Sequence, residues 1–262
     1  KLNPIASLDY DFYNRIGALY TEYKVSLGSV SLLGGVRYEH TWQNVTYAAG
    51  QGNNFSTQYG SLVPTASLQF NISQTQNIGL SYNMRISRPG ISYLNPYVDL
   101  SDPTARSYGN SDLEVERGHN ISLVYNLYSP KWIVNLTLRE QLVANGISSY
   151  SFYDANNLLN TTYGNIVRSS VTGLNAFINW NASGTTRIYL NGGLNYTDLR
   201  SEVLGQSNSG LSYNAMLGIQ QALPLNFSLS ANIVAMGKNY SLQGWSSGMS
   251  MAMVGLTKSF LD

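Results

Sequence analysis

Apolar and small polar residues alternate along most of this chain, in runs of about a dozen residues. Over 77–88, every second residue from Ile78 to Ile86 is apolar, and the residues between them are Asn, Gly, Ser and Arg. A period of two is that of a β-strand whose two faces meet different surroundings. The pattern therefore predicts an all-β chain whose strands each carry one apolar face.

Eleven such strands are expected. Their approximate bounds are 10–26, 29–46, 59–72, 77–88, 118–128, 131–145, 161–181, 186–197, 209–223, 226–238 and 247–260. Several exceed the roughly 9–11 residues that cross a bilayer at a tilt, whereas strands of soluble proteins are usually about 5–6 residues long. The strands are long enough to span a membrane and to project beyond it.

The connections between these strands alternate between short and long. The short ones are 27–29, 73–76, 129–131, 182–185 and 223–226; the long ones are 43–58, 89–117, 146–160, 198–208 and 238–246. Bacterial membrane barrels keep their short turns on the periplasmic side. The long connections are therefore expected to face the cell exterior.

A soluble β-sandwich would show the same alternation, so composition decides between the two. Charged residues make up 11% of the chain, against about 25% in an ordinary soluble domain. Aromatic residues also stand at the strand ends, as in the two girdles of a membrane barrel. They are Phe70, Tyr125, Trp132, Trp180 and Phe227 beside short turns, and Tyr38, Tyr196 and Tyr213 toward long connections. Together these features predict an antiparallel transmembrane β-barrel.

The lipid-facing residues can be assigned on most strands. They are Leu62, Pro64, Ala66, Leu68 and Phe70; Ile121, Leu123, Tyr125 and Leu127; Leu174, Ala176, Ile178 and Trp180; Ile188, Leu190 and Leu194; and Phe227, Leu229, Ala231, Ile233 and Ala235.

Two assignments of the lipid face stay open. Glu140 falls on a lipid face, which requires an interface or a bulge. The last strand has its lipid face on either Met249, Met251 and Met253 or Ala252, Val254 and Leu256.

Eleven is an odd number, whereas a single-chain bacterial barrel normally has an even number of strands. We therefore expect residues 1–262 to be a partial outer-membrane β-barrel domain whose remaining strands lie outside this sequence. The sequence shows no signal peptide and begins with Lys1 instead of Met. This favours a longer protein whose N-terminal part precedes Lys1.

A set of motif residues surrounds the second long connection, 89–117, which we call the signature loop. The set comprises Arg85-Ile86-Ser87-Arg88-Pro89, Leu94-Asn95-Pro96-Tyr97, Asp102-Pro103, Gly109-Asn110, Asp112-Leu113 and Glu116. These residues resemble the strand-loop-strand signature of TonB-dependent outer-membrane receptors of the Bacteroidetes outer-membrane β-barrel type, and the segment 256–262 resembles a later turn of the same barrels. The chain departs from the family at Ser111 and Val115, where Pro is usual, so its loop is less stiff.

The resemblance implies a barrel of about 22 strands with a plugged lumen in the outer membrane of a Gram-negative, Bacteroidetes-type cell. It implies contact with outer-membrane lipid and with the TonB system, the latter through a part of the protein upstream of Lys1. A surface lipoprotein is a further candidate partner. The implied function is uptake of a nutrient ligand through the plugged lumen.

The signature loop also contains the candidate ligand-binding residues. Tyr93, Tyr97 and Tyr108 are able to stack on a sugar or another flat ligand, and Asp99 and Asp102 belong to an acidic group that is able to hold Ca²⁺. The acidic spacing is irregular, however, and arginines in the loop are able to pair with these carboxylates. The prolines and glycines of the signature favour a purely structural role in shaping the loop.

Enzymatic, metal and nucleic-acid functions find little support. The run 244–248 fits G-x-S-x-G, but no His follows it and no strand-to-helix turn is expected there. His40 and His119 lack neighbours at metal-ligand spacing, and a net charge of +1 provides no basic patch for nucleic acid. We expect neither an enzyme nor a bound cofactor or metal.

Three functions remain to be compared. The first is the barrel region of an energised uptake receptor. The second is a passive outer-membrane pore or an adhesion barrel without a plug, and the third is a soluble β-sandwich carbohydrate-binding module. The transported substrate cannot be read from loops of this composition.

Overall fold

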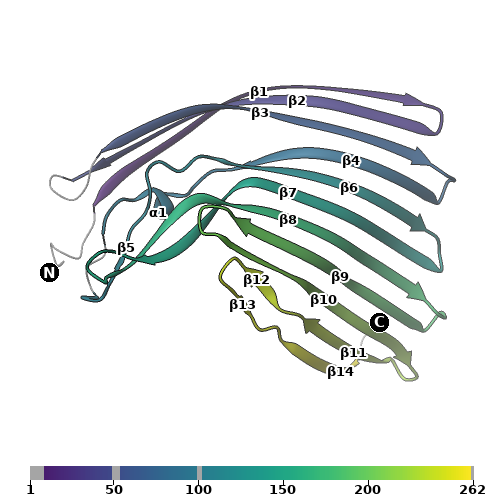
Figure 1. Cartoon of the computed structure of the whole chain (residues 1–262). Coiled ribbons are helices and arrows are strands. Elements are labelled where there is room, and N and C mark those ends of the chain that lie inside the picture. Colours follow the sequence, from purple (N-terminus) through teal and green to yellow (C-terminus); the bar gives the residue numbers. More distant parts are fainter. Residues whose placement is uncertain (1–8, 49–53, 99–101, 261–262) are drawn as a thin grey trace.

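The computed structural model describes residues 9–48, 54–98 and 102–260. Its long strands form one antiparallel sheet in the order β1-β2-β3-β4-β6-β7-β8-β9-β10-β11-β14. Figure 1 shows this sheet curving like part of a barrel wall, with β1 and β14 as its two edges. A single continuous sheet of this kind differs from the two packed sheets of a β-sandwich.

The eleven strands of the sheet path match the eleven expected from the sequence. They are β1 (Tyr10–Leu27), β2 (Val30–Tyr47), β3 (Phe55–Asn71), β4 (Gln76–Ser87), β6 (Glu116–Tyr128), β7 (Trp132–Tyr153), β8 (Leu159–Asn181), β9 (Thr186–Ser201), β10 (Gln206–Leu223), β11 (Phe227–Met236) and β14 (Ser250–Lys258). The sequence patterns missed the shortest elements, which are α1 (Ile91–Leu94), β5 (Ala105–Ser107), β12 (Asn239–Ser241) and β13 (Gly244–Ser246).

Strand pairing sorts the side chains into two faces, because directly opposed residues point to the same side of a sheet. One row runs across eight strands through Leu32, Leu68, Leu80, Leu123, Leu138, Leu174, Leu194 and Tyr213. The adjacent row lies one residue nearer the long connections on every strand. It contains Ser67, Ser81, Ser122, Arg139, Gly173, Asn195 and Ser212. We call the side of the sheet with Leu80 the apolar face and the side with Ser81 the polar face.

The pairing confirms the predicted lipid-facing residues and settles the last strand. Leu229 pairs with Leu256, and Ala231 pairs with Val254. Since Leu229 and Ala231 belong to the apolar face, Ala252, Val254 and Leu256 lie there too. Met251 and Met253 therefore lie on the polar face. The alternative that places Met249, Met251 and Met253 on the lipid face is wrong.

Glu140 lies on the apolar face, and the structure explains how it is accommodated. It pairs with Thr172, which pairs with Tyr196, so the carboxylate shares a row with an aromatic residue of the expected outer girdle. Ser170 donates a hydrogen bond of 2.6 Å to Glu140 Oε1, and Thr172 donates to Oε2. The row lies eight residues beyond Trp132, which corresponds to about 27 Å along the strand and about 20 Å of membrane depth at the usual tilt. Glu140 thus lies near an interface.

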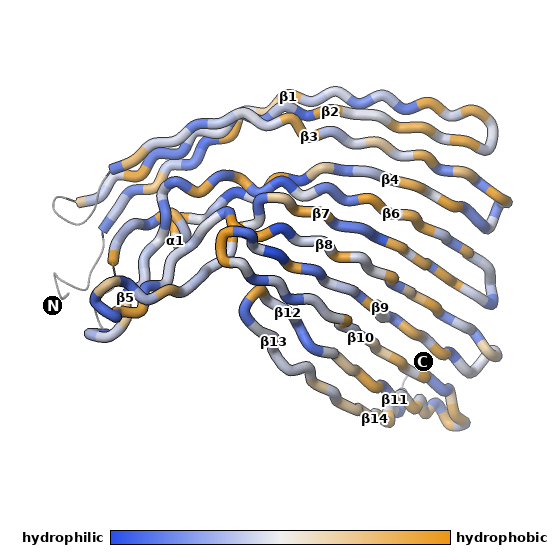
Figure 2. The backbone as a smooth tube through the Cα atoms, viewed as in Figure 1, coloured by the Kyte–Doolittle hydropathy of each residue, from blue (hydrophilic) through white to orange (hydrophobic). Residues whose placement is uncertain are grey.

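Trp132 and Trp180 mark the opposite interface of the apolar face. The two residues are directly paired, and their rings stack with centroids 5.2 Å apart and an interplanar angle of 5°. Both stand next to short connections, as the sequence predicted. Figure 2 shows that hydrophobic and hydrophilic positions alternate along most of the long strands.

Two of the predicted long connections are largely strand. Over 146–160 only 154–158 lies outside β7 and β8, and over 198–208 only 202–205 lies outside β9 and β10. A register shift between Val143 and Gly146 interrupts the alternation in β7, and this hid the strand's continuation. The connection expected at 43–58 likewise shortens to 48–54, and the one at 238–246 contains the β12–β13 hairpin.

Candidate functional site

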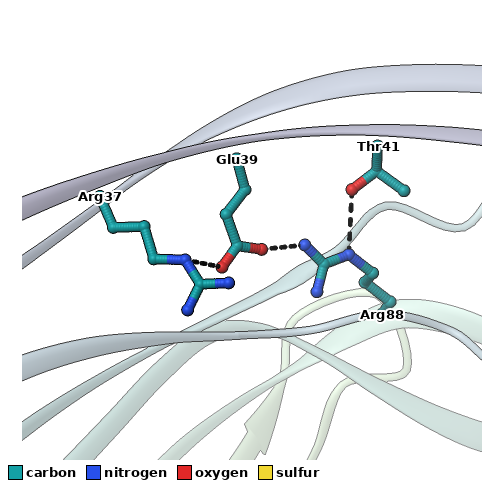
Figure 3. Close-up of polar contacts among 4 residues, drawn as sticks. All are labelled: Arg37, Glu39, Thr41 and Arg88. Carbon is teal, nitrogen blue, oxygen red and sulfur yellow. Dashed lines mark hydrogen bonds and ion pairs between the residues drawn. The ribbon is translucent and has the colours of Figure 1, made fainter. Parts of the chain in front are cut away.

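A buried carboxylate lies on the polar face at the middle of β2. Glu39 is only 7% exposed and forms ion pairs with two arginines. Arg37 Nε lies 2.8 Å from Glu39 Oε1, and Arg88 Nη2 contacts Glu39 Oε2. Arg88 Nε also donates to Thr41 Oγ1 at 3.1 Å (Figure 3).

This cluster connects two strands that are not neighbours. Arg88 follows β4, whereas Glu39 and Thr41 belong to β2, and β3 lies between these strands in the sheet. The side chains therefore reach across the polar face. Because Glu39 is buried, the two guanidinium groups take the place of water around its carboxylate. The cluster anchors the start of the signature loop to the far side of β3.

The signature loop then crosses the polar face toward β8. Tyr47 Oη donates a 2.7 Å hydrogen bond to Asn95 Oδ1, just after α1. Further along, β5 pairs in parallel with the start of β8, Leu159 to Thr161. The loop thus contacts the wall at β2 and again at β8, and Figure 1 shows α1 and β5 at the end of the sheet opposite the short turns.

Gly109 provides the tightest point of the loop. Its amide donates to Asn95 O at 2.7 Å, and the next amide, of Asn110, donates to Tyr93 O at 2.6 Å. A Cβ at position 109 would lie 2.5 Å from Asn95 O and 2.6 Å from Tyr93 O. Only glycine fits this crossing of two backbone segments, so the signature glycine has a structural cause.

Two asparagines on β7 and β8 hold the end of the loop. Asn165 Oδ1 accepts from Glu114 N at 2.8 Å, and its Nδ2 donates to Glu114 O and to Asn145 O at 3.0 Å each. Asn145 Nδ2 donates to Val115 O at 2.7 Å. Glu116 Oε1 in turn accepts from Ile147 N. Sequence reasoning missed these two asparagines, because nothing in a single sequence distinguishes them from the many others.

The three tyrosines that the sequence selected have different contacts. The Tyr93 ring lies 4.6 Å from the ring of Tyr163, and Tyr93 is 41% exposed. Tyr97 and Tyr108 are half-buried, and their amides donate to Asn95 Oδ1 and Thr161 O. Their ligand-binding role stays a prediction, while these contacts support the structural role.

The structure describes Asp102, one of the two aspartates that the sequence analysis selected as candidate ligand-binding residues. Asp102 is exposed and accepts hydrogen bonds of 2.7 Å from both the hydroxyl and the amide of Thr104. These hydrogen bonds lower the pKa of the Asp102 carboxyl, because they favour its charged form. Asp102 therefore closes a turn. Asp99 lies outside the described residues.

The described residues contain no group of three or more His, Cys, Asp or Glu side chains arranged to hold a metal ion. His119 Nδ1 lies 2.9 Å from Tyr82 Oη, and His40 Nδ1 lies 3.2 Å from Tyr38 Oη. Both histidines occupy the apolar face beside aromatic rings. None of the helices in the described part is long and apolar enough to cross a membrane.

One apolar face, one polar face and a loop folded across the polar face together define a membrane-spanning β-barrel wall. The comparisons agree with this class. The chain belongs to the outer membrane protein beta-barrel family, whose model matches residues 1–262. It is accordingly a protein of the bacterial outer membrane. A search of curated proteins found no match.

Solved barrels of import proteins have the same fold. The copper transporter OprC superposes with a TM-score of 0.69 at 10% identity, over 94% of this chain and 41% of OprC. The ferric-catecholate import receptor Fiu from E. coli K12 gives 0.67 at 12% identity, covering 96% and 39%. The ferric yersiniabactin uptake receptor FyuA from Yersinia pestis gives 0.65 at 13% identity, covering 95% and 39%. The chain spans about two fifths of the length of each.

Proposed function

We propose that this chain is the barrel region of a TonB-dependent outer-membrane receptor that takes up a nutrient ligand through a plugged lumen. In this proposal the apolar face meets lipid, the polar face lines the lumen, and the long-connection end faces the medium. The observation that best supports this proposal is the position of the signature loop across the polar face. It is anchored to β2 by Arg88 and to β7 and β8 by Asn145 and Asn165, so it narrows the lumen where a ligand would enter.

The proposal includes further strands and a plug outside this sequence. Within the described residues, β1 and β14 are unpaired edges of the sheet, and a bilayer cannot satisfy their backbone groups with hydrogen bonds. The import proteins that share the fold are also more than twice as long as this chain. A complete barrel of about 22 strands would leave an open channel without a plug.

The proposed partners follow from the same arrangement. Outer-membrane lipid would contact the apolar face, and the TonB system would act through an upstream part of the receptor. A surface lipoprotein as a further partner of the receptor stays a prediction. Enzymatic activity is not proposed, because the G-x-S-x-G run lies in and after the short strand β13 and not at a strand-to-helix turn.

Two measurements separate this proposal from a passive pore or an adhesion barrel. In planar bilayers, the full-length protein should show little steady conductance, because the plug and the loop close the lumen. In cells, uptake of a nutrient that the protein supports should stop when TonB is removed; metal chelates, glycans and peptides form the screening set. Steady conductance together with TonB-independent uptake would establish the passive pore. The absence of any supported uptake would favour the adhesion barrel.

A further inference from the structure

The methionines of this chain are unevenly distributed. Of the six, five lie between residues 216 and 253, and the sixth is Met84. Met84 occupies the apolar face of β4, where it pairs with His119. The other five gather at the polar face of β10, β11 and β14, although the interior of a membrane barrel is ordinarily polar. Elsewhere the polar face is built mainly from Asn, Ser, Thr and Gly, so these thioethers call for an explanation.

Strand pairing places the sulfur-bearing residues close together. Met216 and Met251 both pair with Val234, one from each side. Met253 is the next polar-face residue along β14, about 7 Å from Met251. Met236 is the next one along β11 and donates its amide to Met249 O at 2.7 Å, so these two residues lie side by side. The five residues, which we call the methionine row, follow β11 and β14 toward the long connection between them, with Met216 beside them on β10.

The thioethers are accessible. The exposed fractions of Met236, Met249, Met251 and Met253 lie between 43% and 57%. Met236 and Met249 line a pocket of about 530 Å³ with the side chains of Asn195 and Asn214. Methionine has three rotatable bonds, so neighbouring sulfurs are able to converge on one ion.

The ligand types around the methionine row determine which metal ion the row is able to bind. On the polar face of β10, β11 and β14, within the described residues, there is no carboxylate and no histidine. Hard cations such as Ca²⁺ and Mg²⁺ require several oxygen ligands, including carboxylates, and Zn²⁺ binds Cys, His and carboxylates. Neutral thioethers select Cu(I). A cationic group beside the row, Lys238, has its Nζ 3.9 Å from the centroid of the Trp245 ring.

We propose that the methionine row is a binding site for a soft monovalent cation, Cu(I) in the cell, on the lumen wall. The proposal rests on the proposed function only for the assignment of the polar face to the lumen; the site itself rests on the strand register that brings the methionines to one face. A row of similar ligands lets an ion move from one pair of sulfurs to the next without leaving thioether coordination.

Binding of Ag⁺ tests the site directly, because Ag⁺ is a soft monovalent ion that needs no reducing agent. The full-length receptor, purified from outer membranes in detergent, is dialysed against Ag⁺, and the bound silver is quantified by mass spectrometry. A competition with a chromophoric Cu(I) chelator under anaerobic, reducing conditions provides the second arm. Saturable binding of both ions, not displaced by excess Zn²⁺ or Ca²⁺, is expected.

The triple variant Met236→Leu, Met251→Leu and Met253→Leu removes three sulfurs while keeping apolar side chains of similar volume. It should bind Ag⁺ and Cu(I) about tenfold more weakly or worse, and Met84→Leu should bind them like the natural protein. Circular dichroism and heat-modified gel mobility confirm that both variants fold. Lack of saturable binding, displacement by Zn²⁺, or equal affinity of the triple variant would show that the row is only an apolar contact surface.

This measurement is independent of transport. A protein that conducts passively, and so contradicts the proposed function, still binds Ag⁺ if the row is a site. A TonB-dependent receptor that binds no Ag⁺ contradicts only the site.

Discussion

At Glu39, one carboxylate is held by two guanidinium groups of unequal exposure. The side chain of Arg88 is 18% exposed and that of Arg37 is 52% exposed, against 9% for Glu39. Removing one partner of a buried pair leaves an uncompensated charge, whereas an exposed pair contributes little. The two arginines should therefore differ in importance although they bind the same carboxylate.

We predict that Arg88→Met destabilises the folded barrel by about 3–5 kcal/mol. Arg37→Met, the matched control, should cost at most about 1 kcal/mol. Urea titrations of the protein refolded in liposomes, followed by heat-modified gel mobility, measure both values. Equal costs for the two variants would show that Glu39 is not effectively buried.

Leu80 and Asn83 test the assignment of the two faces in β4. Leu80 is 48% exposed on the apolar face, and Asn83 accepts a 3.3 Å hydrogen bond from Asn120 on the polar face. Leu80→Lys should impair folding into lipid by about 2–4 kcal/mol, because it places a charge near the membrane midplane. Asn83→Lys, which meets water in the lumen, should cost under about 1 kcal/mol. The reverse order in liposome refolding would mean that the faces are exchanged.

The signature loop is the element whose path depends most on single backbone positions. We predict that Gly109→Ala displaces the loop, because the added Cβ would lie within 2.6 Å of two backbone oxygens. Gly90→Ala is the control within the same loop, since the nearest atom to its Cβ would be Ser92 Oγ at 3.9 Å. Hydrogen exchange of the loop amides should rise in the first variant only. Unchanged protection in Gly109→Ala would contradict the tight crossing of Asn95 and Gly109.

The strands could be predicted because each spans a boundary between lipid and water, which imposes the period of two. Beyond the membrane both faces meet water, so β9 continues there with Leu199 on the polar face and Asp198 on the apolar face, and the sequence predicts a connection instead of a strand. The bulge near Gly146 also shifted the phase of β7. Methionine is apolar, so the two faces of β14 looked equally suited to lipid until pairing with β11 separated them.

The candidate site was harder to predict than the strands. The sequence located the signature loop and its structural glycine and prolines, but not the partners that hold the loop. Glu39, Asn145 and Asn165 lie tens of residues away in sequence, and only the strand register brings them to the loop. Contacts of this kind leave no local pattern.

The whole molecule should have a fixed orientation in the membrane. An epitope tag inserted beside Gly205, in the tight turn between β9 and β10, should bind antibody on intact cells. A tag beside Gly184, in the short turn between β8 and β9, should bind only after the outer membrane is permeabilised. Accessibility of the Gly184 tag alone on intact cells would invert the topology.

The central claim is that one face of this sheet meets lipid and the other meets water. The chain contains no Cys, so single cysteines introduced at each position of 77–86 can carry a nitroxide spin label without background. In the receptor reconstituted in liposomes, labels at even positions such as Leu80 should collide mainly with lipid-soluble oxygen, and labels at odd positions such as Ser81 mainly with a water-soluble nickel chelate. We predict this period-two alternation, with the labels on the apolar face in contact with lipid. Equal accessibility to the nickel chelate at every position, or alternation in the opposite phase, would contradict the account.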